Sequence, residues 1–313
     1  MTLNEKTMQK TTVVVGLAVL ANMLWGSAAP VIKTGYRLFQ VAADAPSSQI
    51  LFAGVRFFLA GILAVLLGSL IYGEFLKPKK SSIKPICILA LFQTIIQYTL
   101  FYIGCAHATG TKVTIASSTG AFISILFSAL LFRQEKLTVR KILGCILGFT
   151  GVVLVNLSPG SLDLDMSFIG EGFVLLSTCA FALANTFSKH FSKTENPVMM
   201  CGYQFILGGA VMTVMGLALG GKLVFPGVSG LLLIVYLAMV SAVAFGVTTT
   251  LMKYNPVSRV SIFGFLNPMF GVTLSILILK ESRQEFGIKG IIALLLVCLG
   301  VFIVNYNKAQ KQN

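Results

Sequence analysis

The sequence predicts an all-α integral membrane protein with ten transmembrane helices. Of its 313 residues, 56% are hydrophobic and only 11% are charged, and the mean hydropathy is +0.88. Soluble proteins are roughly 45–50% apolar and about 25% charged. The apolar residues form blocks of about 20, which is the length that a helix needs to cross a hydrocarbon layer of ~30 Å. A β-barrel is disfavoured because runs such as 62–67 and 291–299 are apolar on every side.

Ten apolar windows, separated by short polar stretches, make up almost the whole chain. The longest interruptions, at 41–48, 73–85 and 158–167, are too short to hold a domain outside the membrane. We therefore expect a single membrane unit. The predicted spans are, in order, 13–36, 50–72, 85–105, 112–132, 139–157, 168–190, 197–219, 229–252, 257–279 and 286–306.

The first window has some features of a secretory signal. Lys6 and Lys10 precede it, and Ser27-Ala28-Ala29 has the small residues of a cleavage site. The helical pattern nevertheless continues to Lys33, and the segment has a counterpart later in the chain. We therefore expect it to be retained as the first span.

The charges indicate how the spans are oriented. A net charge of +14 arises from 24 Lys and Arg against 10 Asp and Glu, but without a soluble domain it predicts no nucleic-acid partner. Sixteen of the basic residues lie on the side of both termini and seven on the other side. Because cytoplasmic loops are enriched in Lys and Arg, both termini are predicted to lie in the cytoplasm.

The six cysteines indicate neither a disulfide framework nor a metal site. All lie within or at the ends of apolar windows, and no two form a Cys-x-x-Cys pair. Such cysteines are typical of small buried apolar residues. We predict no metal, cofactor or catalytic residue.

The second half of the chain repeats the first half. Each half holds five predicted spans, and because five is odd, the second copy must be inverted in the membrane relative to the first. Inverted repeats are typical of secondary transporters, which bind solutes between the halves near the midplane. We expect the two repeats to occupy residues 1–157 and 158–313. The matched positions include Lys112 with Arg259, Glu135 with Glu281 and Asn156 with Asn305, which lie 147, 146 and 149 residues apart.

An ordered set of short motifs resembles a known family along essentially the whole chain. The set resembles the EamA-like transporters of the drug/metabolite transporter superfamily, although the first repeat has Phe122 where the second has Pro268. The resemblance implies a ten-helix bundle of two inverted five-helix repeats that carries small organic metabolites, often outward, across the bacterial cytoplasmic membrane. The motifs are Asn22-Met-Leu-Trp25-Gly26-Ser27 with Lys33, Arg56-Phe-Phe-Leu-Ala60, Glu135-Lys-Leu-Thr followed by Gly144 and Gly151, and Asn267-Pro268 thirteen residues before Glu281.

Arg56 is the most informative candidate for solute binding. It lies about seven residues into the second predicted span, where a charged side chain is costly and is by default a functional candidate. It would contact a solute carboxylate or line an outer vestibule. The alternative is a structural role in which the side chain extends to the nearby membrane surface. Gln204 is its counterpart in the second repeat.

Polar side chains in other spans are further candidates. Gln93 and Gln97 are four residues apart, and Phe101 continues their helix face; they either line a wet cavity or bond to neighbouring helices. Asn22 and Trp25 are three residues apart in the first span, where Trp25 could equally be a packing residue.

Prolines interrupt two of the predicted spans. Pro268 follows Asn267 at the centre of the ninth span and removes a backbone donor there. Such a break in a membrane helix lines a cavity, forms a hinge or is a bare kink. We predict Asn267 as a solute contact and Pro30 and Pro268 as hinges.

The glycine motifs admit two interpretations. Gly144-x-x-x-Gly148 and Gly216-x-x-x-Gly220 are typical of close helix packing inside a chain or at a homodimer face. A homodimer is therefore a possible assembly, and packing inside the chain is the simpler interpretation.

These observations predict a secondary transporter and not an enzyme. Its partners would be the bilayer and a small organic solute, an amino acid or a related compound, moved by alternating access and most simply by export. All ten acidic residues fall at span ends or in loops, which favours facilitated transport or exchange over proton coupling. The alternatives are a membrane-embedded transferase acting on a lipid or prenyl substrate, which would need clustered carboxylates, and a scaffold that transports nothing.

Overall fold

The computed structural model describes residues 5–42, 44–108, 110–156, 167–279 and 287–306. Helices account for nearly all of this part of the chain, which contains no strand. The elements are α1 (Glu5–Gln9), α2 (Thr11–Leu38), α3 (Pro46–Tyr72), α4 (Lys80–Leu89), η1 (Ala90–Ile96), α5 (Gln97–His107), α6 (Gly110–Leu126), η2 (Phe127–Leu131), α7 (Val139–Asn156), η3 (Phe168–Gly172), α8 (Phe173–Phe191), α9 (Pro197–Ala218), α10 (Val228–Tyr254), α11 (Val257–Ser261), η4 (Ile262–Phe265), α12 (Leu266–Leu279) and α13 (Gly287–Asn305).

Seven helical segments of the described residues are long and apolar enough to cross a membrane. A shorter apolar stretch, Ile291–Asn305, lies within α13. These segments confirm the prediction of an all-helical, multi-pass membrane protein, whereas the count of ten spans stays a prediction. The seven are Thr11–Leu38, Pro46–Tyr72, Lys80–His107, Lys112–Leu131, Phe168–Phe191, Pro197–Ala218 and Val228–Tyr254.

Local sequence signals explain where several helices begin and end. α3 starts with Pro46, which needs no N–H partner in the first turn, and ends before Gly73, whose φ of 72° suits glycine. At the start of α9, the side-chain oxygen of Asn196 accepts hydrogen bonds from the N–H groups of Val198 (2.9 Å) and Met199 (3.1 Å). α3 starts four residues before the predicted span 50–72. Its first turn is polar, and a window of apolar residues does not include such a turn.

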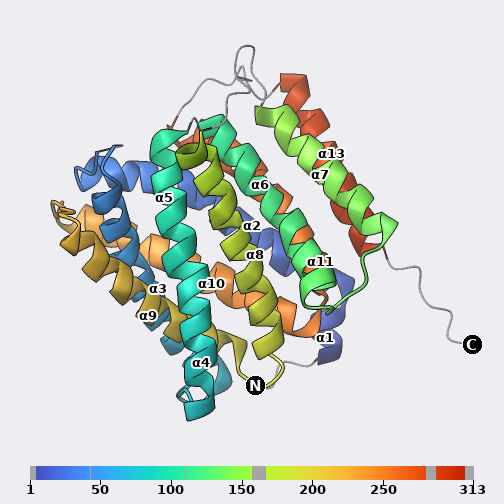
Figure 1. Cartoon of the computed structure of the whole chain (residues 1–313), viewed down its shortest axis with the longest axis horizontal. Helices are drawn as coiled ribbons and strands as arrows, with labels where there is room; N and C mark the ends of the chain where they lie inside the picture. The colour runs from blue at the N-terminus through green and yellow to red at the C-terminus, as the bar shows by residue number, and fades with distance from the viewer. Residues whose placement is uncertain (1–4, 43, 109, 157–166, 280–286, 307–313) are drawn as a thin grey trace, which may run out of the picture.

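The helices form a bundle with one closely packed pair at each side (Figure 1). α3 packs along α9 at one side, α7 packs along α13 at the other, and α2, α6, α8 and α10 lie between these pairs. One apolar core surrounds Ile125 and Phe265 between α2, α6, α7 and α13, and a second surrounds Phe57 and Phe205 between α3, α9 and α10.

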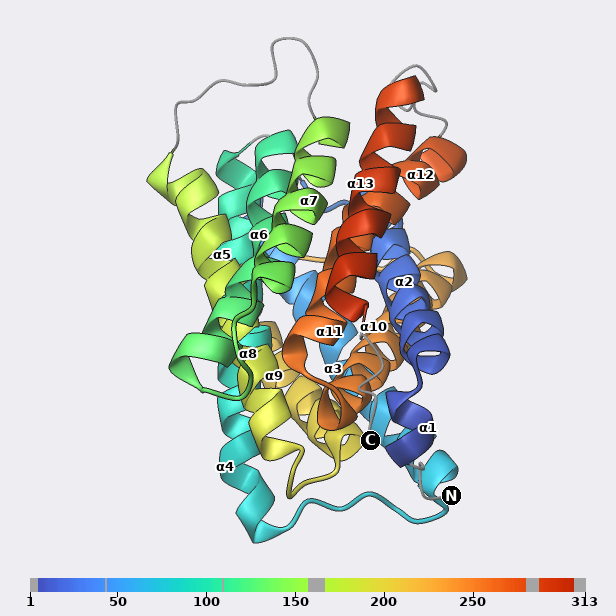
Figure 2. The same ribbon diagram turned by 90° about the vertical axis from the view of Figure 1, so that its right-hand side faces the viewer.

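Both ends of the described chain lie at the same end of the bundle (Figure 2). The start of α1, the end of α13 and the loops at 73–79, 132–138 and 192–196 are found there. We call this the terminal end and the opposite one the distal end. The predicted loops after Asn156 and Leu279 lie outside the described residues.

Glycines allow the backbones of the two side pairs to come into direct contact. A Cβ atom on Gly61 of α3 would lie 2.5 Å from the carbonyl oxygen of Gly202 in α9. A Cβ atom on Gly300 of α13 would lie 2.5 Å from the carbonyl oxygen of Gly144 in α7. Since real Cβ atoms do not approach this closely, both crossings require glycine. Gly144 is thus used for packing inside the chain, and a homodimer stays a prediction.

Candidate functional site

α3 carries Arg56 into the interior of the bundle. Arg56 is only 3% exposed, and its guanidinium carbon lies 4.4 Å from the centre of the Phe57 ring. Its Nε atom has no hydrogen-bond partner, and no carboxylate in the described part of the chain forms an ion pair with it. A buried cation without an anionic partner is costly, so a solute anion placed here would be stabilised.

Three tyrosines from two helices surround this cation. Tyr36 of α2 and both Tyr98 and Tyr102 of α5 lie close enough for electrostatic interaction with the Arg56 charge. The Tyr98 ring lies 4.4 Å from the Phe57 ring, measured between centroids, and the hydroxyls of Tyr36 and Tyr102 lie next to each other. The cation is therefore set among phenol groups that can donate hydrogen bonds to the same anion.

A chain of aromatic rings links Arg56 to Trp25. Phe57 stacks on Phe205 at 5.1 Å, Phe205 meets Phe245 edge to face at 5.0 Å, and Phe245 meets Trp25 at 5.0 Å. Trp25 is half-buried, and its Nε1 donor has no partner. One aromatic cluster is thus built from rings of α2, α3, α9 and α10. It brings together two of the candidates predicted from the sequence, Arg56 and Trp25.

Asn22 lies one turn before Trp25 in α2. Its amide nitrogen donates to the carbonyl of Ala18 at 2.8 Å, which leaves its Oδ1 acceptor without a partner. Asn22 is 4% exposed. The helix around Trp25 therefore offers one unsatisfied donor and one unsatisfied acceptor.

The third predicted span contains a π-helical turn next to the aromatic cluster. Gln93 is buried within this turn, η1, and Gln97 begins α5 with its Oε1 acceptor unpartnered. Phe101 meets Tyr102 at 5.9 Å and so belongs to the aromatic cluster. Single π-helical turns inside α-helices are frequent at functional sites. Whether Gln93 and Gln97 contact a solute stays a prediction.

Asn267 lies at the contact between α2 and α12, and the two predicted hinge prolines lie one in each of these helices. The carbonyl oxygen of Asn267 lies 3.1 Å from the place where Gly26 would carry a Cβ atom. Gly26 is the residue after Trp25, so the backbone of Asn267 packs against α2 next to Trp25. Pro268 is the third residue of α12, which directly follows the 3₁₀ turn η4. Pro30 lies inside α2, where its carbonyl accepts a hydrogen bond of 3.0 Å from the Thr34 hydroxyl. The hinge roles of both prolines stay predictions.

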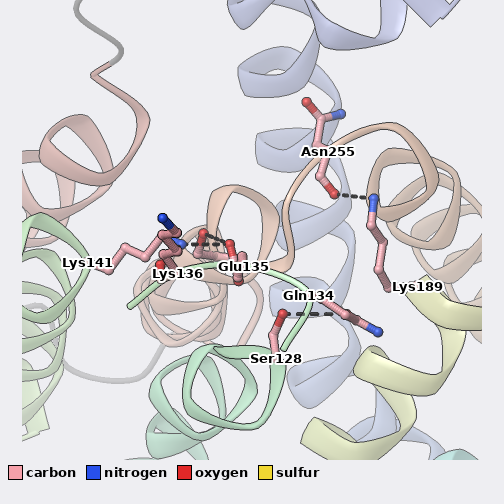
Figure 3. Close-up of polar contacts among 8 residues, drawn as sticks. Ser128, Gln134, Glu135, Lys136, Lys141, Lys189 and Asn255 are labelled. Atoms are coloured by element: carbon pink, nitrogen blue, oxygen red, sulfur yellow. Dashed lines mark hydrogen bonds and ion pairs between the residues drawn. The ribbon is translucent and has the colours of Figure 1, made fainter. Parts of the chain in front are cut away.

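A second polar cluster lies at the terminal end (Figure 3). Glu135 accepts hydrogen bonds from the backbone N–H (2.9 Å) and the hydroxyl of Ser258, and Lys141 donates to it at 2.8 Å. Lys189 donates to the carbonyl oxygens of Lys253 (3.0 Å) and Asn255 (2.9 Å). In the sequence, Glu135 belongs to the repeat and to the family motifs, but it was not among the predicted site residues.

No group of three or more His, Cys, Asp or Glu able to hold a metal ion is present among the described residues. A groove of about 470 Å³ lies between the terminal ends of α7 and α13, apart from the Arg56 cluster. It is lined by Thr138, Val139, Arg140, Lys141, Val304 and Tyr306.

The sequence and the fold match known proteins along nearly the whole chain. The family profile described as "EamA-like transporter family" matches residues 12–157 and 168–306. The chain is 27% identical over 324 aligned positions to the protein of Bacillus subtilis (strain 168) named "Uncharacterized transporter YvbV". This alignment covers 98% of this chain and 96% of that protein. It is 22% identical over 208 residues to the "WAT1-related protein At3g02690, chloroplastic" of Arabidopsis thaliana, over 64% of this chain and 49% of that protein. A solved crystal structure has the same fold with a TM-score of 0.74 at 15% identity, over 94% of this chain and 96% of that one.

Proposed function

Because this chain belongs to the EamA-like transporter family, we propose that it is a secondary transporter for small anionic or zwitterionic organic solutes such as amino acids. It works in the bacterial cytoplasmic membrane with both termini in the cytoplasm, and its physiological direction is export. The solute binds among Asn22, Trp25, Arg56, Gln97 and Phe101, with Gln93 and Asn267 at the edge of the same site.

The unpaired guanidinium of Arg56 is the observation that carries this proposal. Arg presents a planar set of N–H donors that matches a carboxylate, and no carboxylate of the described chain uses it. The neighbouring rings of Phe57, Tyr98 and Trp25 offer an apolar wall for the rest of the solute. Such a combination of an apolar wall with a few polar groups suits a small organic molecule.

Two hydrogen-bond acceptors without partners suit the ammonium group of a zwitterionic solute. The amide oxygens of Asn22 and Gln97 lack hydrogen-bond partners, and such oxygens can accept hydrogen bonds from a solute ammonium group. A zwitterionic solute would thus satisfy the donor of Arg56 and these acceptors together, at little net charge.

The packing supports an inverted repeat and alternating access. Position 54 corresponds to 202 and position 61 to 209, each 148 residues later. Gly61 packs against the carbonyl of Gly202, and a Cβ atom on Gly209 would lie 2.8 Å from the carbonyl oxygen of Gly54, so exchanging the halves exchanges the two contacts. At the other side pair, Gly144 packs against Gly300, and a Cβ atom on Gly151 would lie 2.7 Å from the carbonyl oxygen of Ala293. These crossings are the pivots about which ten spans rock.

Counterflow in proteoliposomes tests the proposal. Vesicles that contain the purified protein are loaded with a panel of unlabelled amino acids and organic acids, and the entry of labelled solute is followed. We expect transient accumulation for at least one carboxylate-bearing solute and none in protein-free vesicles. If no solute of the panel shows counterflow while the protein is folded and inserted, the proposed function is wrong. A transferase or a scaffold would give that result.

A further inference from the structure

Two pairs of helices in the centre of the bundle are tied together along their length. In the first pair, α6 and α8, the Asn185 amide donates to Ser124 at 3.3 Å, and Lys112 pairs with Glu171 of η3 at 3.6 Å. The pair is joined at both ends and would move as one body.

The second pair consists of α2 and the segment α11–η4–α12. Gly26 of α2 packs against the backbone of Asn267, and Arg259 of α11 donates to the Thr11 hydroxyl at 2.9 Å. In the sequence repeat, Lys112 corresponds to Arg259. Each pair therefore has one basic residue that ties the start of one helix to the start of the other.

The loop at 132–138 extends from the first pair to the second. Arg133 has a φ of 49°, and this left-handed residue turns the chain at the end of η2. The Gln134 amide then donates to the carbonyl of Thr186 in α8 at 3.0 Å, which holds the loop on the first pair. The next residue, Glu135, reaches Ser258 at the start of α11, which belongs to the second pair.

The Glu135–Ser258 contact is a strong one. Both carboxylate oxygens are used, since one accepts the Ser258 N–H at 2.9 Å and the other accepts the Ser258 hydroxyl and Lys141. The Glu135 side chain is only 7% exposed, and hydrogen bonds to a charged acceptor in such surroundings are stronger than neutral ones. At the same end, Lys189 binds the last carbonyls of α10.

We propose that Glu135 and Ser258 form a latch that closes the terminal end of the transporter. The inference rests on the proposed function. It assumes that the pair α6 and α8 moves relative to the pair formed by α2 and α11–η4–α12 during transport, and the Glu135–Ser258 contact joins these two pairs. Opening toward the terminal end separates the helix pairs and breaks this contact. The structure is the latched form, in which α6 packs against α11 and η4.

Cysteine labelling behind the latch tests this proposal without any solute. Ser261 is buried one turn after Ser258, and its hydroxyl has no partner. A single Ser261→Cys reporter, in a chain without its six native thiols, is labelled by a membrane-impermeant maleimide from the terminal side. Labelling is compared for the parent, Glu135→Gln, Glu135→Ala and Ser258→Ala. Lys136→Gln is the matched control, because it removes a neighbouring exposed charge that is not part of the latch.

We expect Glu135→Ala to raise the labelling rate by at least about tenfold, since a shift of about 1.4 kcal/mol between the two forms changes their ratio tenfold. Glu135→Gln, which keeps one acceptor, and Ser258→Ala, which keeps the N–H donor, should give smaller increases, and Lys136→Gln none. Thermal unfolding checks that each variant is folded. Unchanged labelling in folded Glu135→Gln and Ser258→Ala would overturn the latch even where counterflow succeeds. Faster labelling without counterflow of any solute would leave the latch standing and remove the transport proposal.

Discussion

The hydroxyl of Thr94 donates a hydrogen bond of 2.7 Å to the side-chain oxygen of Gln204, and both residues are fully buried. Thr94 belongs to the π-helical turn η1, and Gln204 of α9 is the predicted repeat counterpart of Arg56 in α3. In the predicted repeat, a neutral side chain with a paired Oε1 and an unpartnered Nε2 thus corresponds to the cation of the first half.

Breaking this pair should destabilise the fold. In Gln204→Leu the Thr94 hydroxyl loses its acceptor, and an unsatisfied buried hydroxyl costs about 1–3 kcal/mol. We expect a lower midpoint of thermal unfolding in detergent for Gln204→Leu, and partial recovery in the double variant Gln204→Leu, Thr94→Val. Strict additivity of the two single effects in this double-mutant cycle would mean that the pair contributes no coupling energy.

Arg56→Lys and Arg56→Gln separate a solute contact from a structural cation. Lys lacks the planar donor set, so we expect its apparent affinity for a carboxylate solute to fall at least about tenfold, and Gln to lose more. The measurement is initial counterflow against solute concentration, normalised to the amount of inserted protein. An unchanged apparent affinity in both variants would remove Arg56 from the binding site.

Gln97→Leu and Asn267→Leu should impair transport and leave membrane insertion intact. Each substitution removes polar groups without adding charge, so the helices remain apolar enough to insert. Transport is compared with that of Leu295→Ala, which alters an apolar residue that is 64% exposed. Normal counterflow by both test variants would assign Gln97 and Asn267 to packing.

Side chains at the helix crossings should prevent assembly of the two halves. Gly300→Val places atoms against the carbonyl of Gly144, and overpacking of this kind costs about 1–3 kcal/mol or more. Gly16→Ala is the matched control, because nothing lies within 4 Å of a Cβ atom there. We expect a strong loss of monodisperse protein in gel filtration for Gly300→Val only. Equal yields would show that the crossing tolerates a wider separation.

The positive-inside count predicts which side of the membrane each end faces. Single cysteines at Lys79 and Lys136, on a background without native thiols, should react only from the cytoplasm, and one at Lys222 only from outside. All three are exposed, and the structure has the loops of Lys79 and Lys136 at the terminal end. Labelling of Lys79→Cys from outside intact cells would reverse the orientation.

Hydropathy predicted the helices well, because each one is specified by its own apolar residues. The predicted span 197–219 corresponds to Pro197–Ala218, and 168–190 corresponds to η3 and α8, which end at Phe191. The third segment extends to Lys80 and His107, beyond the predicted 85–105, because its first turn is polar. Its π-helical turn has no signature in apolar periodicity.

The site was only partly predictable, because local sequence shows which residues are unusual but not which residues pack around them. Arg56 is visible locally, because a charge among apolar residues stands out in any window. Tyr36 was missed, since its place beside Arg56 depends on how α2 packs against its neighbours. The contact of Glu135 with Ser258 joins residues 123 positions apart; the repeat drew attention to Glu135 but contained no signal for its partner.

Arg56, the one buried cation in the described part of the chain, has an electrical consequence. Membrane voltage acts on a fixed charge whenever the water-filled access to it changes sides, and a full crossing of the field corresponds to about 2.3 kcal/mol per 100 mV. An empty carrier that exposes Arg56 first to one solution and then to the other therefore displaces charge, although the side chain itself scarcely moves. A bound anion neutralises the guanidinium and removes that displacement, whereas a bound zwitterion adds no net charge and leaves it unchanged. For an anionic solute, voltage would then drive the return of the empty carrier and leave the loaded step unaffected, so two similar halves would still favour one direction of net flux. For a zwitterionic solute the two steps would displace equal and opposite charge, and voltage would favour neither direction.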